Sequence, residues 1–128
     1  HLIKLIRSLP ECGAGNQPAK ILVVAPPPIK MAKGRPEVSE KYGCEAGVIL
    51  SHEFASAYKD AAKAYHCGYL DAGLYAEAGD ADGVHFTMES HPRLGKAIAE
   101  AILAMDANND GNTDEKHTVD KLKADIEM

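Results

Sequence analysis

The sequence has no tryptophan and few other aromatic residues, with five tyrosines and two phenylalanines among its 128 residues. No apolar run approaches the roughly 20 residues that a membrane-spanning helix needs, and no signal peptide is recognisable. The net charge of -5 argues against nucleic acid or an anionic membrane as a partner. These absences predict one globular domain, and we expect it to be cytoplasmic.

Cysteine is scarce as well. Cys12, Cys44 and Cys67 lie far apart, are odd in number and show no CxxC spacing. This pattern fits neither a disulfide framework nor a zinc site. We expect three free thiols in a reducing compartment.

Apolar periodicity predicts alternating helices and strands. The run "ILVVAPPP" is β-branched and continuous, which is typical of a strand buried on both faces, and its three prolines end it. We expect residues 29 to 47, with their glycines, to be irregular. The predicted elements are a helix over 2–9, a strand over 21–28, a helix over 49–66, a strand over 67–73 and a helix over 91–105.

One face of the 49–66 helix is expected to be buried. Its apolar residues recur at the spacing of a single helical stripe. These residues are Leu50, Phe54, Ala57, Tyr58, Ala61 and Tyr65.

The alternation of helices and strands predicts an α/β fold, with a parallel sheet and helices on both of its faces. Two strands alone do not complete such a sheet, so one edge of the 21–28 strand would stay unpaired. The apolar stripe of the 2–9 helix is also already established at residue 2, as if that helix began upstream. We therefore expect the chain to be ordered only with a partner. That partner would be a missing N-terminal portion or, failing that, another copy pairing edge to edge.

The stretch "DADGVHFTMES" carries the candidate chemistry. Asp82 lies three residues before His85, and Gly83 between them permits a tight turn. A carboxylate that orients an imidazole forms two thirds of a catalytic triad. Spacing alone is a weak signal, because polar residues of this kind also favour ordinary turns.

The wider pattern strengthens this hypothesis. "KILVVAPPPI", "YLDAG" and "DGVHFT" followed by "HPRLGKAIAEAI" resemble the C-terminal half of the SGNH hydrolases, also called the GDSL esterases, and most of all their arylesterase and acyltransferase branch. The resemblance covers residues 1 to about 104. It implies a flavodoxin-like, three-layer α/β/α sandwich, of which this chain supplies the last two strands and their helices.

The resemblance also implies roles. Asp82 would be the triad acid and His85 the general base of a serine hydrolase that acts on small-acyl carboxylic esters, with acyl transfer to alcohols as a further possibility and no metal or organic cofactor. The family's Gly-Asp-Ser and Gly-x-Asn-Asp blocks, which supply the nucleophile and part of the oxyanion hole, are absent. We expect them upstream of His1, so that this chain alone is inactive.

Two alternatives remain open. Without a nucleophile, the chain could be a non-catalytic α/β remnant or an interaction module. The second alternative is a calcium-dependent binding domain built around the tail, where Asp106, Asn108, Asp110, Gly111 and Asp114 match positions of an EF-hand loop but His117 stands where the bidentate Glu belongs.

The domain assignment follows from these patterns. Residues 1–105 are the hydrolase half, and 106–128 form a polar extension. A helix is expected there over 113–126.

Overall fold

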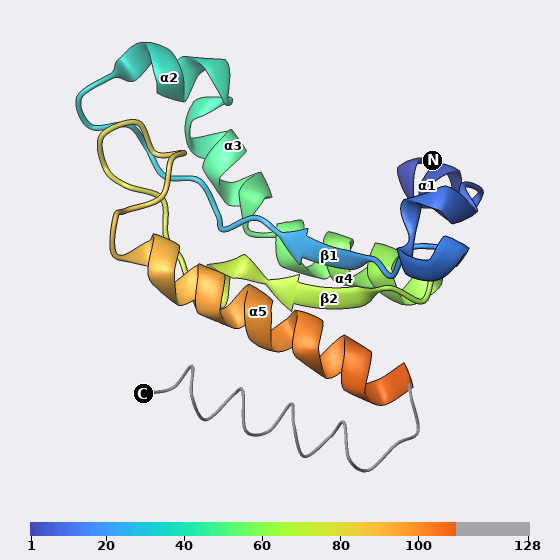
Figure 1. Cartoon of the computed structure of the whole chain (residues 1–128). Helices are drawn as coiled ribbons and strands as arrows, with labels where there is room; N and C mark the ends of the chain where they lie inside the picture. Colours follow the sequence, from blue (N-terminus) through green and yellow to red (C-terminus); the bar gives the residue numbers. More distant parts are fainter. Residues whose placement is uncertain (110–128) are drawn as a thin grey trace.

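The computed structural model describes residues 1–109. The chain folds into five helices and two strands within these residues, joined by short 3-10 turns (Figure 1). The elements are α1 (Leu2–Arg7), η1 (Pro10–Cys12), η2 (Ala14–Asn16), β1 (Leu22–Ala25), α2 (Pro36–Lys41), α3 (Cys44–Ser51), α4 (Phe54–Ala64), β2 (Gly68–Asp71), η3 (Ala72–Leu74) and α5 (Ser90–Asn109).

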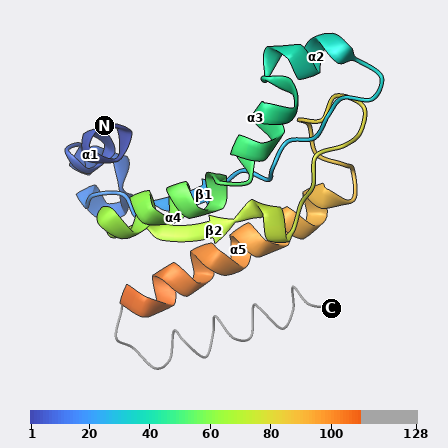
Figure 2. The same ribbon diagram turned by 180° about the vertical axis from the view of Figure 1, so that it is seen from behind.

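The two strands form a parallel pair, with Val23 opposite Tyr69 and Ala25 opposite Asp71. Helix α4 lies on one face of this pair and α5 on the other, as the two opposite views show (Figures 1 and 2). The predicted α/β class, with its parallel sheet between helical layers, is confirmed. The C-terminal ends of both strands point toward α2, α3 and the loop that precedes α5.

The prediction that residues 29–47 are irregular is wrong in part. Helix α2 begins at Pro36, where a proline costs nothing because a first-turn N–H has no partner within the helix. Gly43 then adopts a left-handed conformation, with φ of 86°, and lets the chain turn directly into α3. Of the glycines that suggested a loop, Gly43 is the joint between the two helices, and Gly47 lies within α3.

The predicted 49–66 helix is interrupted. Helix α3 ends at Ser51, whose hydroxyl donates to Val48 O at 2.6 Å. A new helix, α4, begins at Phe54. The predicted buried face is also wrong, because Leu50 and Tyr58 are 61% and 41% exposed.

The prediction that the first strand is buried on both faces is not met in the described part of the chain. Leu22 to Val24 are half-buried, and only Ala25 is fully buried. Within residues 1–109 β1 pairs with β2 alone, so its other edge carries no strand. The edge that the sequence predicted to be open is open here.

The small core lies between the sheet and α5. Leu94 is the largest of the buried apolar side chains within residues 1–109, and apart from Pro27 the others are alanines. It packs with Ala72 and Ala76, and half-buried neighbours including Leu70 and Phe86 extend the cluster. Phe86 ties the loop of the candidate site to this core.

Helix α5 continues through the predicted boundary between residues 105 and 106, and its described part reaches Asn109. The helix expected over 113–126 lies outside the described residues.

Candidate functional site

The loop between η3 and α5 brings the candidate residues beyond the C-terminal ends of the strands (Figure 1). In open parallel sheets this is the end at which ligands bind. The loop closes on itself as a short antiparallel pairing, in which Ala78 faces Phe86 and Thr87 N donates to Glu77 O at 3.1 Å. Its two arms are therefore held together by main-chain hydrogen bonds.

The base of this loop is fastened to the start of α5. Ser90 is fully buried, and its hydroxyl accepts a hydrogen bond from Glu77 N at 3.0 Å. The Thr87 hydroxyl lies 2.7 Å from the Ser90 hydroxyl. A buried hydroxyl with such partners has a structural role, because leaving the buried N–H unpaired would be costly.

Asp82 organises the tip of the loop. Its Oδ1 accepts hydrogen bonds from Val84 N and His85 N, both at 2.9 Å. Gly83 has a φ of 74° and its N–H donates to Gly79 O at 2.9 Å. The carboxylate thus satisfies the main chain of the turn that it begins, as aspartates in turns commonly do.

The second oxygen of the same carboxylate, Oδ2, pairs with His85 Nδ1. The Asp82 side chain is 19% exposed, whereas that of His85 is 88% exposed. Nδ1 of His85 is therefore bound to the Asp82 carboxylate, while the rest of the His85 side chain is exposed and open to a reacting group. This is the arrangement in which a carboxylate fixes the tautomer and orientation of a catalytic imidazole.

Hydrogen bonding holds Asp82 in its charged form. The Val84 N–H, then the side chain and N–H of His85, lower the pKa of Asp82 well below its usual range. The carboxylate stays ionised at neutral pH and can stabilise a positive charge on the imidazole.

Within residues 1–109 no serine is hydrogen-bonded to this pair. The serines are Ser8, Ser39, Ser51, Ser56 and Ser90. Ser39, Ser51 and Ser90 are buried and serve main-chain groups, and Ser8 donates to Leu5 O. Among residues 1–109 no serine hydroxyl forms a hydrogen bond with His85.

Other predicted sites find little support in the described residues. Asp106 and Asn108, the first two positions of the EF-hand match, lie within α5, and the remaining positions from Asp110 onward lie outside the described residues. Cys12, Cys44 and Cys67 are free thiols. No group of three or more His, Cys, Asp or Glu side chains suited to a metal occurs in residues 1–109. None of the helices over that range is both long and apolar enough to cross a bilayer.

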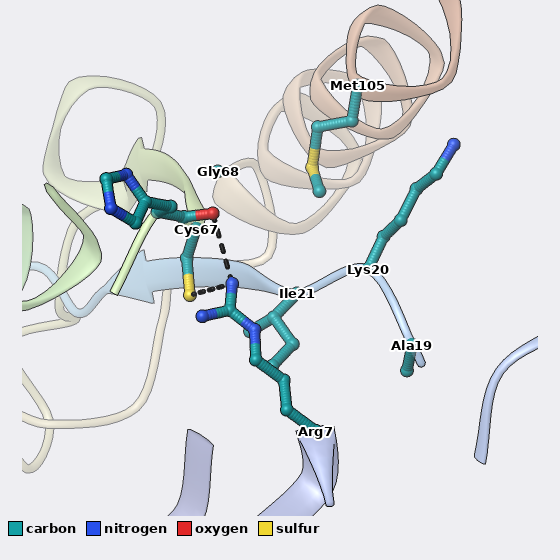
Figure 3. A pocket seen from close by; sticks show the side chains of 8 residues that line it. Arg7, Ala19, Lys20, Ile21, Cys67, Gly68 and Met105 are labelled. Carbon is teal, nitrogen blue, oxygen red and sulfur yellow. Dashed lines mark hydrogen bonds between the residues drawn. The ribbon is translucent and has the colours of Figure 1, made fainter. Parts of the chain in front are cut away.

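A pocket of about 390 Å³ lies at the opposite end of the strands, between α1, β2 and α5 (Figure 3). Its cations already have partners. Arg7 donates to Tyr65 O and, at 3.1 Å, to His66 O, and Lys20 pairs with Asp106 at 3.0 Å. The pocket faces away from Asp82 and His85, so we do not assign it to the candidate site.

The chain is similar to solved esterase structures. A carbohydrate acetylesterase family member from Sinorhizobium meliloti is 27% identical, with a TM-score of 0.72, over 81% of this chain and 47% of its own. The native aryl esterase of M. smegmatis is 29% identical, with a TM-score of 0.69, over 80% of this chain and 47% of its own. Another carbohydrate acetylesterase structure from S. meliloti is 31% identical, with a TM-score of 0.65, over 81% and 49%.

No family model matches the sequence, and no curated protein matches it either. The chain spans about half the length of the solved structures that it matches. The resemblance to the SGNH/GDSL esterases predicted from the sequence is confirmed by these structures, and the chain has the α/β fold expected of the C-terminal half of such an esterase.

Proposed function

We propose that this chain is the acid–base half of a serine esterase, in which Asp82 and His85 act on a serine carried by an N-terminal half of the same fold. The observation that carries the proposal is the Asp82–His85 pair, bound through Nδ1 on a side chain that is otherwise exposed. The similarity to esterase structures supports ester hydrolysis as the reaction class.

In the proposed mechanism His85 takes the proton of the serine hydroxyl as its oxygen attacks the ester carbonyl. The tetrahedral intermediate collapses to an acyl-serine, and the imidazolium protonates the leaving alcohol. Water, activated by His85 in the same way, then releases the acid. Asp82 holds the imidazole and stabilises its positive charge at each step. No metal or organic cofactor enters this scheme.

We propose small acyl groups as substrates because two of the similar structures are carbohydrate acetylesterases. Transfer of the acyl group to an alcohol instead of water would use the same residues. The two outcomes differ only in what attacks the acyl-serine.

The N-terminal half is also the proposed partner. Beyond the open edge of β1, α1 exposes Leu2 and Leu5 by 68% and 57%, and α3 exposes Ile49 by 69%. An apolar strand edge flanked by exposed apolar side chains is the surface that further strands and helices would cover. The length of the matched structures, about twice that of the matched region, supports an N-terminal half as the occupant, with a second copy of this chain as the competing outcome.

The test compares this chain with the intact protein on p-nitrophenyl acetate. We expect no activity above background from residues 1–128 and turnover from the intact protein. An inactive, well-folded intact protein would instead favour a non-catalytic interaction module. Activity of the chain alone that disappears in His85→Ala would mean that the nucleophile lies within these 128 residues.

A further inference from the structure

The segment 29–33, which follows the three prolines after β1, runs beside the turn that carries Asp82. Lys30 N donates to Gly83 O at 2.8 Å, and Lys33 N donates to Asp80 O at 3.1 Å. These two main-chain hydrogen bonds are made on either side of Asp82 in the sequence. They join the turn to a part of the chain about 50 residues away, so the turn is not held by local contacts alone.

The contact is close. A Cβ built on Gly83 would lie 1.9 Å from Lys30 O, so only a glycine permits this approach. Asp82 and Val84 also line one small pocket together with Val38 of α2. By contrast, the ion pairs Lys30–Glu77 (3.1 Å) and Lys33–Asp80 (3.2 Å) are exposed, and such pairs contribute little. The main chain, not the charges, fixes the turn against this segment.

The segment is itself fixed by two buried serines. Ser39 of α2 is 8% exposed, and its hydroxyl accepts a hydrogen bond from Ala32 N at 2.8 Å. Ser51 is 1% exposed and accepts from Ile29 N at 2.9 Å. In the sequence, Ala32 lies between Lys30 and Lys33, whose N–H groups donate to the turn. Without Ser39, the buried Ala32 N–H would have no hydrogen-bond partner.

We propose that Ser39 is a positioning residue for the acid–base pair: it fixes the 29–33 segment through Ala32 N, and that segment fixes the turn of Asp82 and His85. Helices α2 and α3 then have a role beyond filling space, since they present the two hydroxyls that hold the segment. The inference rests on the proposed function for its kinetic consequence, but its structural content is independent of any turnover.

The test uses the intact protein with Ser39→Ala and two comparison variants. Ser39→Thr keeps a hydroxyl acceptor and is expected to rescue. Ala62→Gly, in the buried face of α4 and away from the turn, is the control for a general loss of stability. Two quantities are measured by NMR: the exchange rate of the Lys30 amide and the pH titration of the Asp82 carboxyl.

We expect Ser39→Ala to speed exchange of the Lys30 amide by about tenfold or more, since local opening of the segment becomes easier. The Asp82 titration should move toward its ordinary pKa, and kcat should fall by about 10- to 100-fold with little change in KM, because misplacement of a catalytic group costs rate. Ser39→Thr should restore all three quantities. Ala62→Gly should change none of them beyond its effect on global stability.

A folded Ser39→Ala with wild-type Lys30 exchange and an unchanged Asp82 titration would overturn the inference. If Ser39→Ala does not fold, hydrogen exchange of the wild-type protein provides the test instead. The amides of Lys30, Ala32 and Lys33 should then open together. Rapid exchange of the Ala32 amide beside a protected Lys30 amide would overturn the inference. Absence of ester hydrolysis in the wild type, with the NMR changes present, would refute the proposed function and leave the positioning role standing.

Discussion

The turn that carries Asp82 and His85 and the edge of strand β1 differ in how many of their main-chain groups have hydrogen-bond partners in this chain. The turn satisfies its main-chain groups through Asp82, its own arms and the 29–33 segment. Strand β1 has a partner on one side only, and its apolar residues Leu22 to Val24 stay half-buried. The hydrogen bonds of the pair are thus complete within residues 1–109, whereas the sheet beside it has one unpaired edge there.

The directions of the main-chain hydrogen bonds along β1 show which of its residues lie at the open edge. Gly68 N donates to Ile21 O at 2.9 Å, so Ile21 directs its main-chain groups toward β2. Successive residues of a strand alternate in direction, which places the groups of Val23 and Ala25 on the same side and those of Leu22 and Val24 on the open edge. Hydrogen exchange of individual amides can therefore distinguish the paired side of β1 from its open edge.

The largest effect is expected from the turn itself. In the intact protein, His85→Ala should lower kcat by about 10⁵- to 10⁶-fold and Asp82→Asn by about 10⁴-fold, because the base is indispensable and the acid only orients and stabilises it. Steady-state hydrolysis of p-nitrophenyl acetate measures both. The control is His52→Ala, which removes an exposed histidine between α3 and α4 and should keep wild-type kcat. Near-wild-type turnover in a folded His85→Ala would end the triad interpretation.

The next effect concerns the open edge. In the isolated chain, we expect the amides of Leu22 and Val24 to exchange at least about 10³-fold faster than in the intact protein, where a further strand protects them. Val23 and Ala25 should change less, because they face β2. Hydrogen exchange followed by NMR gives these rates. Equal protection of all four amides in a strictly monomeric isolated chain would show that the edge needs no partner.

The core that joins the two regions should respond to truncation. Leu94→Ala is expected to lower the free energy of unfolding by about 2–5 kcal/mol, since it leaves a cavity between the sheet and α5. The matched control is Ile102→Ala on the same helix, where the side chain is 47% exposed and the loss should be much smaller. Denaturant unfolding of the intact protein measures both. A loss as large for Ile102 would mean that another part of the protein covers it.

The smallest effect is on the pH dependence of stability. Hydrogen bonds lower the pKa of Asp82 in the folded state, so its contribution is complete above the ordinary value of about 3.9 and is lost as the pH falls through the lowered one. Asp82→Asn should therefore flatten the acid limb of unfolding free energy against pH. Glu37→Gln is the comparison, because Arg35 lowers the pKa of Glu37 on an exposed surface. An unchanged acid limb in Asp82→Asn would show that the carboxylate is not held as described.

Periodicity was sufficient to predict α1, both strands and α5, because each shows a continuous apolar run or stripe. It failed for residues 36–51, where Gly43 joins two helices instead of marking a loop. It also failed for the buried face of α4, because tertiary packing buries Ala62 and leaves Tyr58 at the surface. Local patterns do not record which face of a helix meets a sheet.

The candidate pair was predicted from the motif around Asp82 and His85, and the structure brings their side chains together. The contribution of residues 29–33 could not be predicted. Lys30 and Lys33 bond the turn through main-chain groups, which leave no mark on residue type. Only Gly83, whose lack of a side chain permits the approach of Lys30 O, gave a sequence signal of that contact.

If His85 activates a serine outside residues 1–128, that serine should be the reactive one in the intact protein. Labelling the intact protein with a serine-reactive fluorophosphonate, followed by peptide mass spectrometry, identifies the reactive serine. We predict a single labelled serine outside residues 1–128, with labelling strongly slowed by His85→Ala and unaffected by His52→Ala. A label on any of Ser8, Ser39, Ser51, Ser56 or Ser90, or a labelling rate that does not depend on His85, would contradict the account.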